Sequence, residues 1–364
     1  INLFILPNSL SEFNRVPGYL PFCSSKWAPG CDFLPCSRRD FTLAKLLLEG
    51  PVRRWADRSP GFRKLVWSVE TALVWLLAGL LRLLPVDTAS AAAGKLMRLL
   101  GPGRKKSQVM RDNLRIAFPD KGDEQIDALV RDVWSNAGAV MAEYPHLKTI
   151  CSDQADDRLQ VEIRGTSTVY NAGGRPAVFV SGHFANWELP AAVAASLDIP
   201  LAVVYTALQN PGLDRLLKRA RKPLGCAVVE RQGAMRKLLR NLRNGVSAGL
   251  IMDQRVDAGE PLPFFGQERP TSLTAAQLAV KLDLDLIPVQ IQRLRGAHFR
   301  VVFHEPLRPA DPAADAHDKA VQMTKEINRL FESWIMEKPG DWYCSKRRWP
   351  KPLMRRLLGQ KKTV

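Results

Sequence analysis

The sequence predicts an α/β fold with a mixed, largely parallel central sheet flanked by helices, preceded by an N-terminal hydrophobic helix. From about residue 161 onward, short β-branched runs alternate with segments whose apolar residues recur three or four positions apart. Alternation of this kind is typical of a parallel sheet with helical crossovers. Residues 65–84 are mostly apolar, which predicts the separate hydrophobic helix.

The predicted elements follow one another at short intervals. Strands are expected at residues 177–180, 201–205, 227–229, 246–252, 286–291 and 299–303. Helices are expected at residues 189–197, 213–221, 235–242, 273–282 and 319–336. Residues 85–147 are expected to be helical as well, so helices would precede the sheet in the chain.

The chain divides into four predicted parts. Residues 1–48 have no sustained period and are expected to be a poorly ordered extension, and residues 49–84 to be a membrane-anchoring helical segment. Residues 85–350 form the main domain, and residues 351–364 a basic tail. Glu70 interrupts the apolar run, which is close to the roughly 20 residues that a spanning helix needs. Both a spanning helix and a helix lying on the membrane remain open.

The charge of the chain predicts a polyanionic neighbour. It carries 53 Lys and Arg against 36 Asp and Glu, a formal net charge of +17. Residues 345–364 hold eight cations and no acid, with leucines interleaved, which suits an anionic membrane surface. Nucleic acid is not expected as a partner, because the sequence has no recognition-helix signature.

The cysteines predict neither a disulfide framework nor a metal site. Cys151, Cys226 and Cys344 lie singly, which is typical of a reducing compartment. Cys23, Cys31 and Cys36 form a cluster, but their spacing matches no established zinc pattern and no histidine lies near them. No metal and no cofactor is expected.

Residues 177–190 form the most informative motif. A short apolar run ends in small residues and is followed by His183 and, five positions later, Glu188. Pro190 can be helical only within a first turn, so the next helix should begin near Asn186 or Trp187. His183 would then lie outside the helix and Glu188 at its start, where the helix dipole favours a carboxylate.

This pair predicts a general base with an orienting acid. His183 could take a proton from a hydroxyl group, while Glu188 would bond to the other ring nitrogen and fix its tautomer. Zinc is not favoured, since no second histidine lies four positions away. Ser181 lacks the flanking glycines of a nucleophile elbow, so direct attack by an acceptor hydroxyl on an activated acyl donor fits better than an acyl-enzyme. A purely structural histidine at a strand end remains an alternative.

Three further polar residues follow predicted strands. Arg231 ends one strand, and Asp253 and Gln254 end the next. Because ligands in open α/β sheets bind at the carboxyl ends of the strands, these residues are expected to meet His183 at one rim. Arg231 could grip a phosphate. Asp253 and Gln254 could orient Arg231 or the substrate, or only cap a turn.

Residues 261–266, Pro-Leu-Pro-Phe-Phe-Gly, form an expected apolar loop after the same strand. Exposed aromatic residues there would suit an acyl chain or a membrane. Packing against the core is the alternative.

Together these motifs resemble the late acyltransferases of lipid A biosynthesis, the lauroyl and myristoyl acyltransferases. The resemblance extends from about residue 71 to residue 350 and rests on seven segments. These are residues 111–119, residues 142–147, His183-Phe-Ala-Asn-Trp-Glu188, Arg231-Gln-Gly with Met252-Asp-Gln254 and Pro263-Phe-Phe-Gly266, and residues 342–349.

The resemblance implies an acyltransferase domain over residues 85–350, with a fold related to glycerol-3-phosphate acyltransferases. It implies an enzyme at the cytoplasmic face of the inner membrane that moves a fatty acyl group from acyl carrier protein to a hydroxyl of a phosphorylated, Kdo-bearing lipid A precursor. His183 would be the base and Glu188 its partner in an H-x4-D/E motif. Asn186, Arg231, Asp253 and Gln254 would contact the substrate.

Two positions depart from the family pattern. Ala185 stands where a glycine is usual, and Trp342-Tyr-Cys-Ser-Lys-Arg347 lacks the second tryptophan and the histidine of the closing motif. An acyltransferase acting on another glycolipid or a lysophospholipid is the alternative within the enzyme class. A basic membrane-binding protein without catalytic activity is the alternative outside it.

Overall fold

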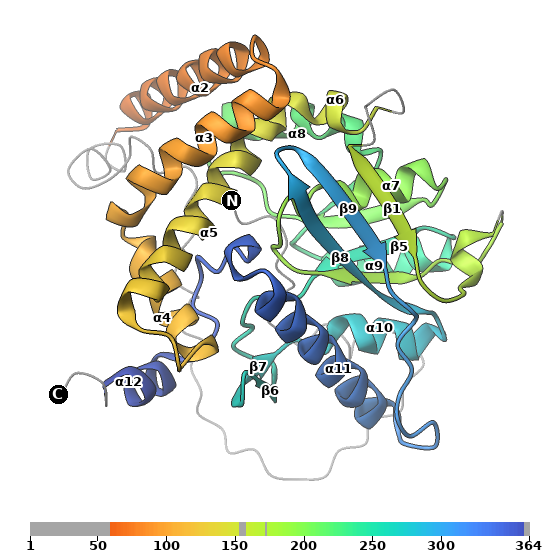
Figure 1. Ribbon diagram of the computed structural model, residues 1–364. Coiled ribbons are helices and arrows are strands. Elements are labelled where there is room, and N and C mark those ends of the chain that lie inside the picture. The colour runs from red at the N-terminus through yellow and green to blue at the C-terminus, as the bar shows by residue number, and fades with distance from the viewer. Residues whose placement is uncertain (1–58, 153–157, 172, 360–364) are drawn as a thin grey trace.

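The protein is described here by a computed structural model that places residues 59–152, 158–171 and 173–359. The expected extension over residues 1–48 lies outside these residues. At the centre is a seven-stranded sheet of order β1-β9-β8-β2-β5-β3-β4, with helices packed around it (Figure 1). The neighbours pair in parallel except β8 and β9, which are antiparallel. The predicted fold class is confirmed.

The strands agree closely with the sequence pattern. They are β1 (Leu159–Ile163), β2 (Val178–Ser181), β3 (Leu201–Tyr205), β4 (Ala227–Glu230), β5 (Ser247–Ile251), β8 (Leu286–Arg295) and β9 (His298–Phe303). β2 and β3 are buried at every position, as expected for inner strands of a parallel sheet covered on both faces. β1 was not predicted, because it lies at the sheet edge and mixes polar with apolar residues.

The predicted crossover helices are present. They are α7 (Leu189–Ser196), α8 (Pro211–Ala220), α9 (Ala234–Arg243), α10 (Thr274–Leu282) and α11 (Ala316–Glu337). α7 contacts β3, β8 and β9, whereas α10 contacts β2, β8 and α11. The sheet and its connections therefore deliver the ends of β2 and β5, two neighbouring strands, to the same edge.

Among the residues that the structure describes, four long helices precede the sheet in the chain. They are α2 (Pro60–Arg82), α3 (Val86–Leu100), α4 (Lys106–Ala117) and α5 (Asp123–Glu143). α3 packs along α5, and α2 lies at the outer edge of the molecule next to α3 (Figure 1). Among the described residues, α2 is the one helix long and apolar enough to cross a membrane.

The segment expected to be an apolar loop is instead a hairpin. β6 (Glu260–Phe264) pairs with β7 (Gln267–Thr271), and the turn contains Phe265 with φ 49° and Gly266. Phe264 is fully buried, with the guanidinium groups of Arg269 and Arg348 each 4.5 Å from its ring centroid. The expectation of an exposed aromatic loop is therefore wrong for Phe264, and the alternative of core packing is confirmed.

The predicted basic tail begins as a packed helix. α12 (Lys351–Gly359) contacts α4 and buries Met354, while Arg355 and Arg356 stay exposed. Its interleaved leucines therefore serve in part to dock it on the domain.

Candidate active site

A tight turn joins β2 to α7 and carries the predicted motif. An added Cβ on Gly182 would lie 2.4 Å from the ring of Phe184, so only glycine fits there. Ala185 adopts φ 41°, a conformation that favours glycine and agrees with the glycine usual at this position. α7 begins at Leu189, as the predicted helix over residues 189–197 does and two to three residues later than the start inferred from Pro190. Pro190 lies in its first turn and Glu188 at its N-cap. The turn gives His183 and Glu188 different bonding partners.

The C-terminal motif fastens this turn. The backbone N–H of Ala185 donates to the carbonyl of Asp341 at 2.9 Å, and the N–H of Tyr343 donates to the carbonyl of His183 at 2.8 Å. The rings of Trp187 and Tyr343 stack with centroids 5.6 Å apart. The closing motif therefore supports the turn, a role that the sequence did not assign to it.

His183 is paired with Asp253, not with Glu188. Its Nδ1 lies 2.7 Å from Asp253 Oδ1, and the two side chains are 0% and 2% exposed. His183 follows β2 and Asp253 follows β5, so the parallel pairing of these strands brings the two residues together. The predicted bond between His183 and Glu188 is wrong. Asp253, expected to orient Arg231 or the substrate, orients the imidazole instead.

The environment of Asp253 keeps it ionised. Burial alone would raise the pKa of this carboxyl, but His183, the buried Arg348 and the indole of Trp342 together hold its pKa below the usual value. Trp342 Nε1 donates to Asp253 Oδ2 at 3.1 Å. Because a carboxylate can only accept, Nδ1 carries the ring hydrogen in this pair, and a neutral ring would present Nε2 as the proton acceptor.

Gln254 also lies against the ring. Its Nε2 is 3.3 Å from His183 Nδ1 and 3.4 Å from His183 Nε2, and its Oε1 is buried with no hydrogen-bond partner among the described residues. His183 is fully buried. The amide of Gln254 therefore contributes to the burial of the imidazole.

Glu188 belongs to a second buried cluster. It accepts a hydrogen bond from the hydroxyl of Tyr144 at 2.7 Å and another from Nη2 of Arg221. Burial raises the pKa of Tyr144 well above its usual value, and the charge of Glu188 raises it further. Burial would lower the pKa of Arg221, but Glu188 outweighs this and raises it. Arg221 therefore stays charged and compensates the charge of Glu188.

Asn186 turns away from the site, toward the helices beneath it. Its Nδ2 donates to Glu143 Oε2 at 2.8 Å, and Glu143 is fully buried at the end of α5. Glu143 also accepts from Ser90 Oγ at 2.6 Å and from Arg293 Nη1 at 2.5 Å. The contacts of Asn186 therefore anchor the turn to α3, α5 and β8, and they offer no support for the substrate contact expected of this residue.

Arg231 lies apart from the imidazole. It follows β4, which is separated from β2 by β5 and β3, so the two strand ends are about 14 Å apart. Its backbone N–H donates to the carbonyl of Tyr205 at 2.9 Å, and its side chain is half-buried. The structure brings His183, Asp253 and Gln254 together and leaves a phosphate contact by Arg231 as a prediction.

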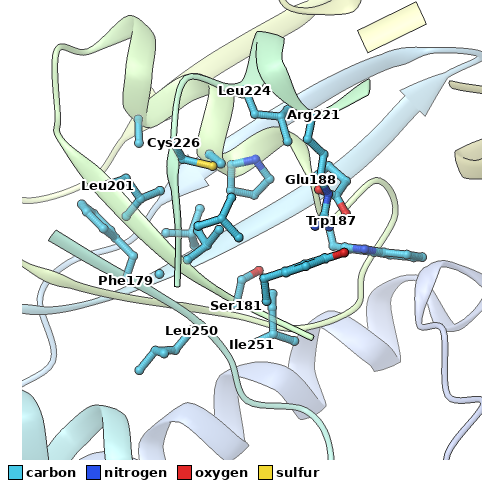
Figure 2. Close-up of a pocket in the computed structure, with 18 of the residues that line it drawn as sticks. Phe179, Ser181, Trp187, Glu188, Leu201, Arg221, Leu224, Cys226, Leu250 and Ile251 are labelled. Carbon is cyan, nitrogen blue, oxygen red and sulfur yellow. Dashed lines mark hydrogen bonds and ion pairs between the residues drawn. The ribbon is translucent and has the colours of Figure 1, made fainter. Parts of the chain in front are cut away.

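An apolar cavity of about 220 Å³ opens beside the turn (Figure 2). Glu188 and Arg221 lie at one side of it, and Phe179 and Leu201 at the opposite side. Gly249 on the central strand β5 contributes no side chain to its wall, where an added Cβ would lie 3.0 Å from Val203 Cγ1. The mostly apolar lining, with a few charged side chains, suits a hydrocarbon chain that carries a polar group at one end.

No group of three or more His, Cys, Asp or Glu side chains within residues 59–152, 158–171 and 173–359 is placed to hold a metal ion. Cys226 lines the cavity, and burial raises the pKa of its thiol to about 11. A thiol held protonated in this way is a poor nucleophile.

Four residues of the site were missed by sequence reasoning: Glu143, Tyr144, Arg221 and Trp342. Three of them lie in the segments that carry the family resemblance, so a signal was present. Arg221 could not be identified from the sequence. It follows a basic amphipathic helix, where a further arginine is expected to be a solvent-exposed side chain.

Comparison with known proteins agrees with the motifs. Residues 59–351 match the family described as bacterial lipid A biosynthesis acyltransferase. The chain is 20% identical over 291 residues to lipid A biosynthesis acyltransferase 2 of Shigella flexneri, covering 76% of this chain and 93% of that protein. It is 20% identical over 275 residues to the lipid A biosynthesis myristoyltransferase of Escherichia coli K12, covering 72% of this chain and 84% of that protein.

Among solved structures, the chain is similar to the 1-acyl-sn-glycerophosphate acyltransferase PlsC of Thermotoga maritima. The match has a TM-score of 0.30 and 14% identity, and it covers 67% of this chain and 97% of that one.

Proposed function

The chain belongs to the bacterial lipid A biosynthesis acyltransferase family, and on that premise we propose that it transfers a fatty acyl group from an acyl carrier protein thioester to a hydroxyl of a Kdo-bearing lipid A precursor. The observation that carries the proposal is the buried His183–Asp253 pair, 2.7 Å apart, at a turn whose Trp187 and Glu188 line an apolar cavity. An imidazole held by a carboxylate is the arrangement of a general base that deprotonates a hydroxyl group.

The proposed reaction is direct transfer. His183 Nε2 takes the proton of the acceptor hydroxyl as its oxygen forms a bond to the thioester carbonyl carbon. The carbon–sulfur bond then breaks, and the departing thiolate receives the proton from the imidazolium. Asp253 holds the ring and stabilises its charge while it carries the proton. No covalent acyl-enzyme forms in this scheme, and no metal or cofactor takes part in it.

The cavity would hold the donated acyl chain. Its walls come from β2, β3, β5, α7 and the turn after α8, and all but a few of its lining side chains are apolar. Burying each methylene of the chain there contributes about 0.8 kcal/mol. The wall residues then select chain length, because a cavity of fixed depth excludes chains that are too long.

The Glu188 cluster would shape the entrance to the cavity. Lys218, Arg221 and Lys222 line the same cavity near Glu188, so a thioester entering there meets several cations. These cations suit the phosphorylated arm and the acidic surface of an acyl carrier protein, and Arg231 would meet a phosphate of the acceptor. The location that fits these partners is the cytoplasmic face of the inner membrane, beside its anionic leaflet.

The direct test is acyl transfer by the purified full chain. The protein is incubated with acyl carrier protein thioesters and three acceptors: a Kdo-bearing lipid A precursor, another glycolipid and a lysophospholipid. We expect product only with the lipid A precursor. Turnover restricted to a lysophospholipid would refute the lipid A assignment, and no turnover on any acceptor would favour a membrane-binding protein without catalytic activity.

His183→Ala supplies the catalytic control. General-base catalysis typically contributes about 10² to 10⁴ in rate, so we expect kcat to fall by about 10³ with fold and membrane binding retained. The matched variant His317→Ala removes an exposed histidine on α11 and should keep full activity. Equal rates in the two variants would rule out His183 as the base.

A further inference from the structure

The helices α2 and α3 expose an unusual concentration of large apolar side chains. Trp75 is 65% exposed and Leu99 is 77% exposed, although both lie in well-formed helices. Most of the exposed large apolar residues of the described chain lie on these two helices or between them: Leu65, Val69, Leu73, Trp75, Leu76, Leu77, Leu80, Leu83, Leu84, Leu96, Leu99 and Leu100. A patch of this size on a soluble surface marks an interaction site.

The opposite side of α2 is docked on the domain. Glu70 is 3% exposed, and Asn210 at the start of α8 donates from Nδ2 to Glu70 Oε2 at 3.2 Å and to the carbonyl of Trp67 at 2.9 Å. An added Cβ on Gly212 would lie 2.3 Å from Thr71 Oγ1, so the two helices meet closely. The polar residues that interrupt the apolar run are those that fasten the helix.

A second attachment lies at the other end of α2. Arg82 Nε donates to the carbonyl of Pro145 at 3.1 Å, and His146 Nε2 donates to the carbonyl of Leu81 at 3.0 Å. The side chains of intermediate exposure recur at helical spacing between the two attachments, at Trp67, Thr71, Val74, Ala78 and Leu81. α2 is therefore held along its length and not only at one end.

This double attachment is incompatible with a helix that crosses a bilayer. The attachments at Trp67 and Arg82 are about 22 Å apart along the helix, against a hydrocarbon thickness of about 30 Å. If α2 crossed the membrane, α8 with the exposed Arg215 and Arg219 would follow it into the hydrocarbon. Charged side chains are not tolerated there without partners.

We propose that α2 and α3 form a monotopic membrane-binding surface, with α2 lying in the plane of one anionic leaflet and its outer face among the acyl chains. Lys64, Lys95, Arg104 and Lys105 are exposed around this apolar surface and would meet anionic headgroups. The outer face of α2 from Val69 to Leu80 carries no charged side chain, as such a position requires.

The surface lies next to the candidate site. The turn that begins with Tyr144 contacts α2, and the Tyr144 hydroxyl is bonded to Glu188, which lines the cavity. If the proposed function holds, this arrangement places the entrance at the leaflet, where a lipid acceptor is held. The membrane surface itself is argued without reference to catalysis.

Labelling in sealed inner-membrane vesicles tests the orientation of α2. Ser59→Cys and Thr88→Cys place single cysteines at either end of α2 in the full chain, with its six natural cysteines replaced by alanine. The cysteine-free parent must retain membrane binding. A membrane-impermeant maleimide added from one side should label both positions equally or neither. Labelling of only one of them from a given side would show that α2 crosses the bilayer and overturn the proposal.

Vesicle binding tests the proposed membrane-binding surface of α2 and α3. The assay uses no acyl donor, so its result does not depend on whether the proposed acyl transfer takes place. Leu73→Glu, Leu76→Glu and Leu80→Glu are combined on the outer face of α2. Val161→Glu, Leu294→Glu and Met336→Glu are combined as the matched control on exposed apolar residues elsewhere. We expect the first triple variant to bind phosphatidylethanolamine–phosphatidylglycerol vesicles at least about tenfold more weakly, and the control to bind as the parent does.

Two results would contradict the membrane surface. One is unchanged vesicle binding by the α2 triple variant. The other is a parent that sediments as a dimer and becomes a monomer in this variant, with vesicle binding intact, because the apolar face would then cover a second copy of the chain.

Discussion

The two ends of the His183 to Glu188 motif differ in what surrounds them. His183 lies in a buried cluster with Asp253, Gln254 and Trp342, tied to the C-terminal segment. Glu188 lies in a cluster with Tyr144 and Arg221 that borders the apolar cavity. A segment of six residues thus contributes to two separate clusters. The spacing of a motif does not by itself show that its members are in contact.

The two clusters suit different functions. The His183 cluster has a single carboxylate on the imidazole, which suits proton transfer. The Glu188 cluster has a compensated charge pair, which suits a fixed and polar entrance to a hydrophobic cavity. Replacing Asp253 and Glu188 in turn can therefore distinguish two effects. One is the loss of orientation of His183, and the other is a change in the polar wall of the cavity.

The largest difference is expected between Asp253→Asn and Glu188→Gln. Asp253→Asn should lower kcat by about 10² to 10³ with little change in KM, because the amide favours the wrong tautomer of His183. The exposed acid Asp257, changed to Asn, is the matched control and should stay near full activity. Steady-state kinetics with acyl carrier protein thioester measure both.

Glu188→Gln should act chiefly on stability and donor binding. It leaves the buried Arg221 uncompensated, at a cost of about 3 kcal/mol or more in the free energy of unfolding. We expect a lower melting temperature, a raised KM for the donor and a kcat within about tenfold of the parent. If Glu188→Gln lowered kcat as much as Asp253→Asn does, at unchanged stability, Glu188 and not Asp253 would be the acid that orients His183.

Glu143→Gln tests whether the hydrogen bonds of Glu143 hold the turn that carries His183 and Glu188. Glu143 joins Asn186, Ser90 and Arg293, so the amide should loosen the turn and lower kcat by about tenfold without changing the pH dependence of kcat. Asp132→Asn alters an exposed ion pair on the same helix and serves as control. An unchanged kcat would show that the turn does not depend on this network.

Gly249→Ala tests the cavity alone. The added methyl group would narrow the wall near Val203 and Leu201, so kcat/KM should fall by about tenfold for the longest accepted acyl chain and change little for a chain two carbons shorter. Gly122→Ala, where an added Cβ meets nothing within 4 Å, is the control. An equal loss for all chain lengths would place the acyl chain elsewhere.

The smallest effect is expected in the acid stability of the protein. Because the pKa of Asp253 is lowered in the folded state, its ionisation stabilises the fold above the unfolded value near 3.8, and this contribution is lost as pH falls through the folded pKa. Asp253→Asn lacks the contribution, so the parent should lose more stability than the variant on acidification below about pH 4. Urea unfolding at several pH values measures the difference. Parallel curves for the two proteins would contradict the lowered pKa.

The fold was largely predictable from sequence, because its elements have strong local patterns. The inner strands are continuous apolar runs, and the crossover helices repeat apolar residues at helical spacing. The edge strand β1 and the hairpin of β6 and β7 were missed. β1 has no buried residue, and the hairpin carries Pro261, Pro263 and Pro270, which argue against a strand in any local pattern.

The candidate site was predictable in part. The strand ends correctly predicted that His183, Asp253 and Gln254 would share one edge of the sheet, because β2 and β5 are neighbours. Which acid bonds to the imidazole depends on the direction of a turn held by residues more than 150 positions away, at Asp341 and Tyr343. The partners of Glu188 and Asn186 also come from distant helices, and no local spacing encodes them.

Nitrogen-15 NMR of the histidine side chains tests the pairing of His183 with Asp253 most directly. The full chain should show a deshielded Nδ1 proton that is absent in His183→Gln, absent in Asp253→Asn and present in Glu188→Gln. A resonance that survives in Asp253→Asn and disappears in Glu188→Gln would contradict the account.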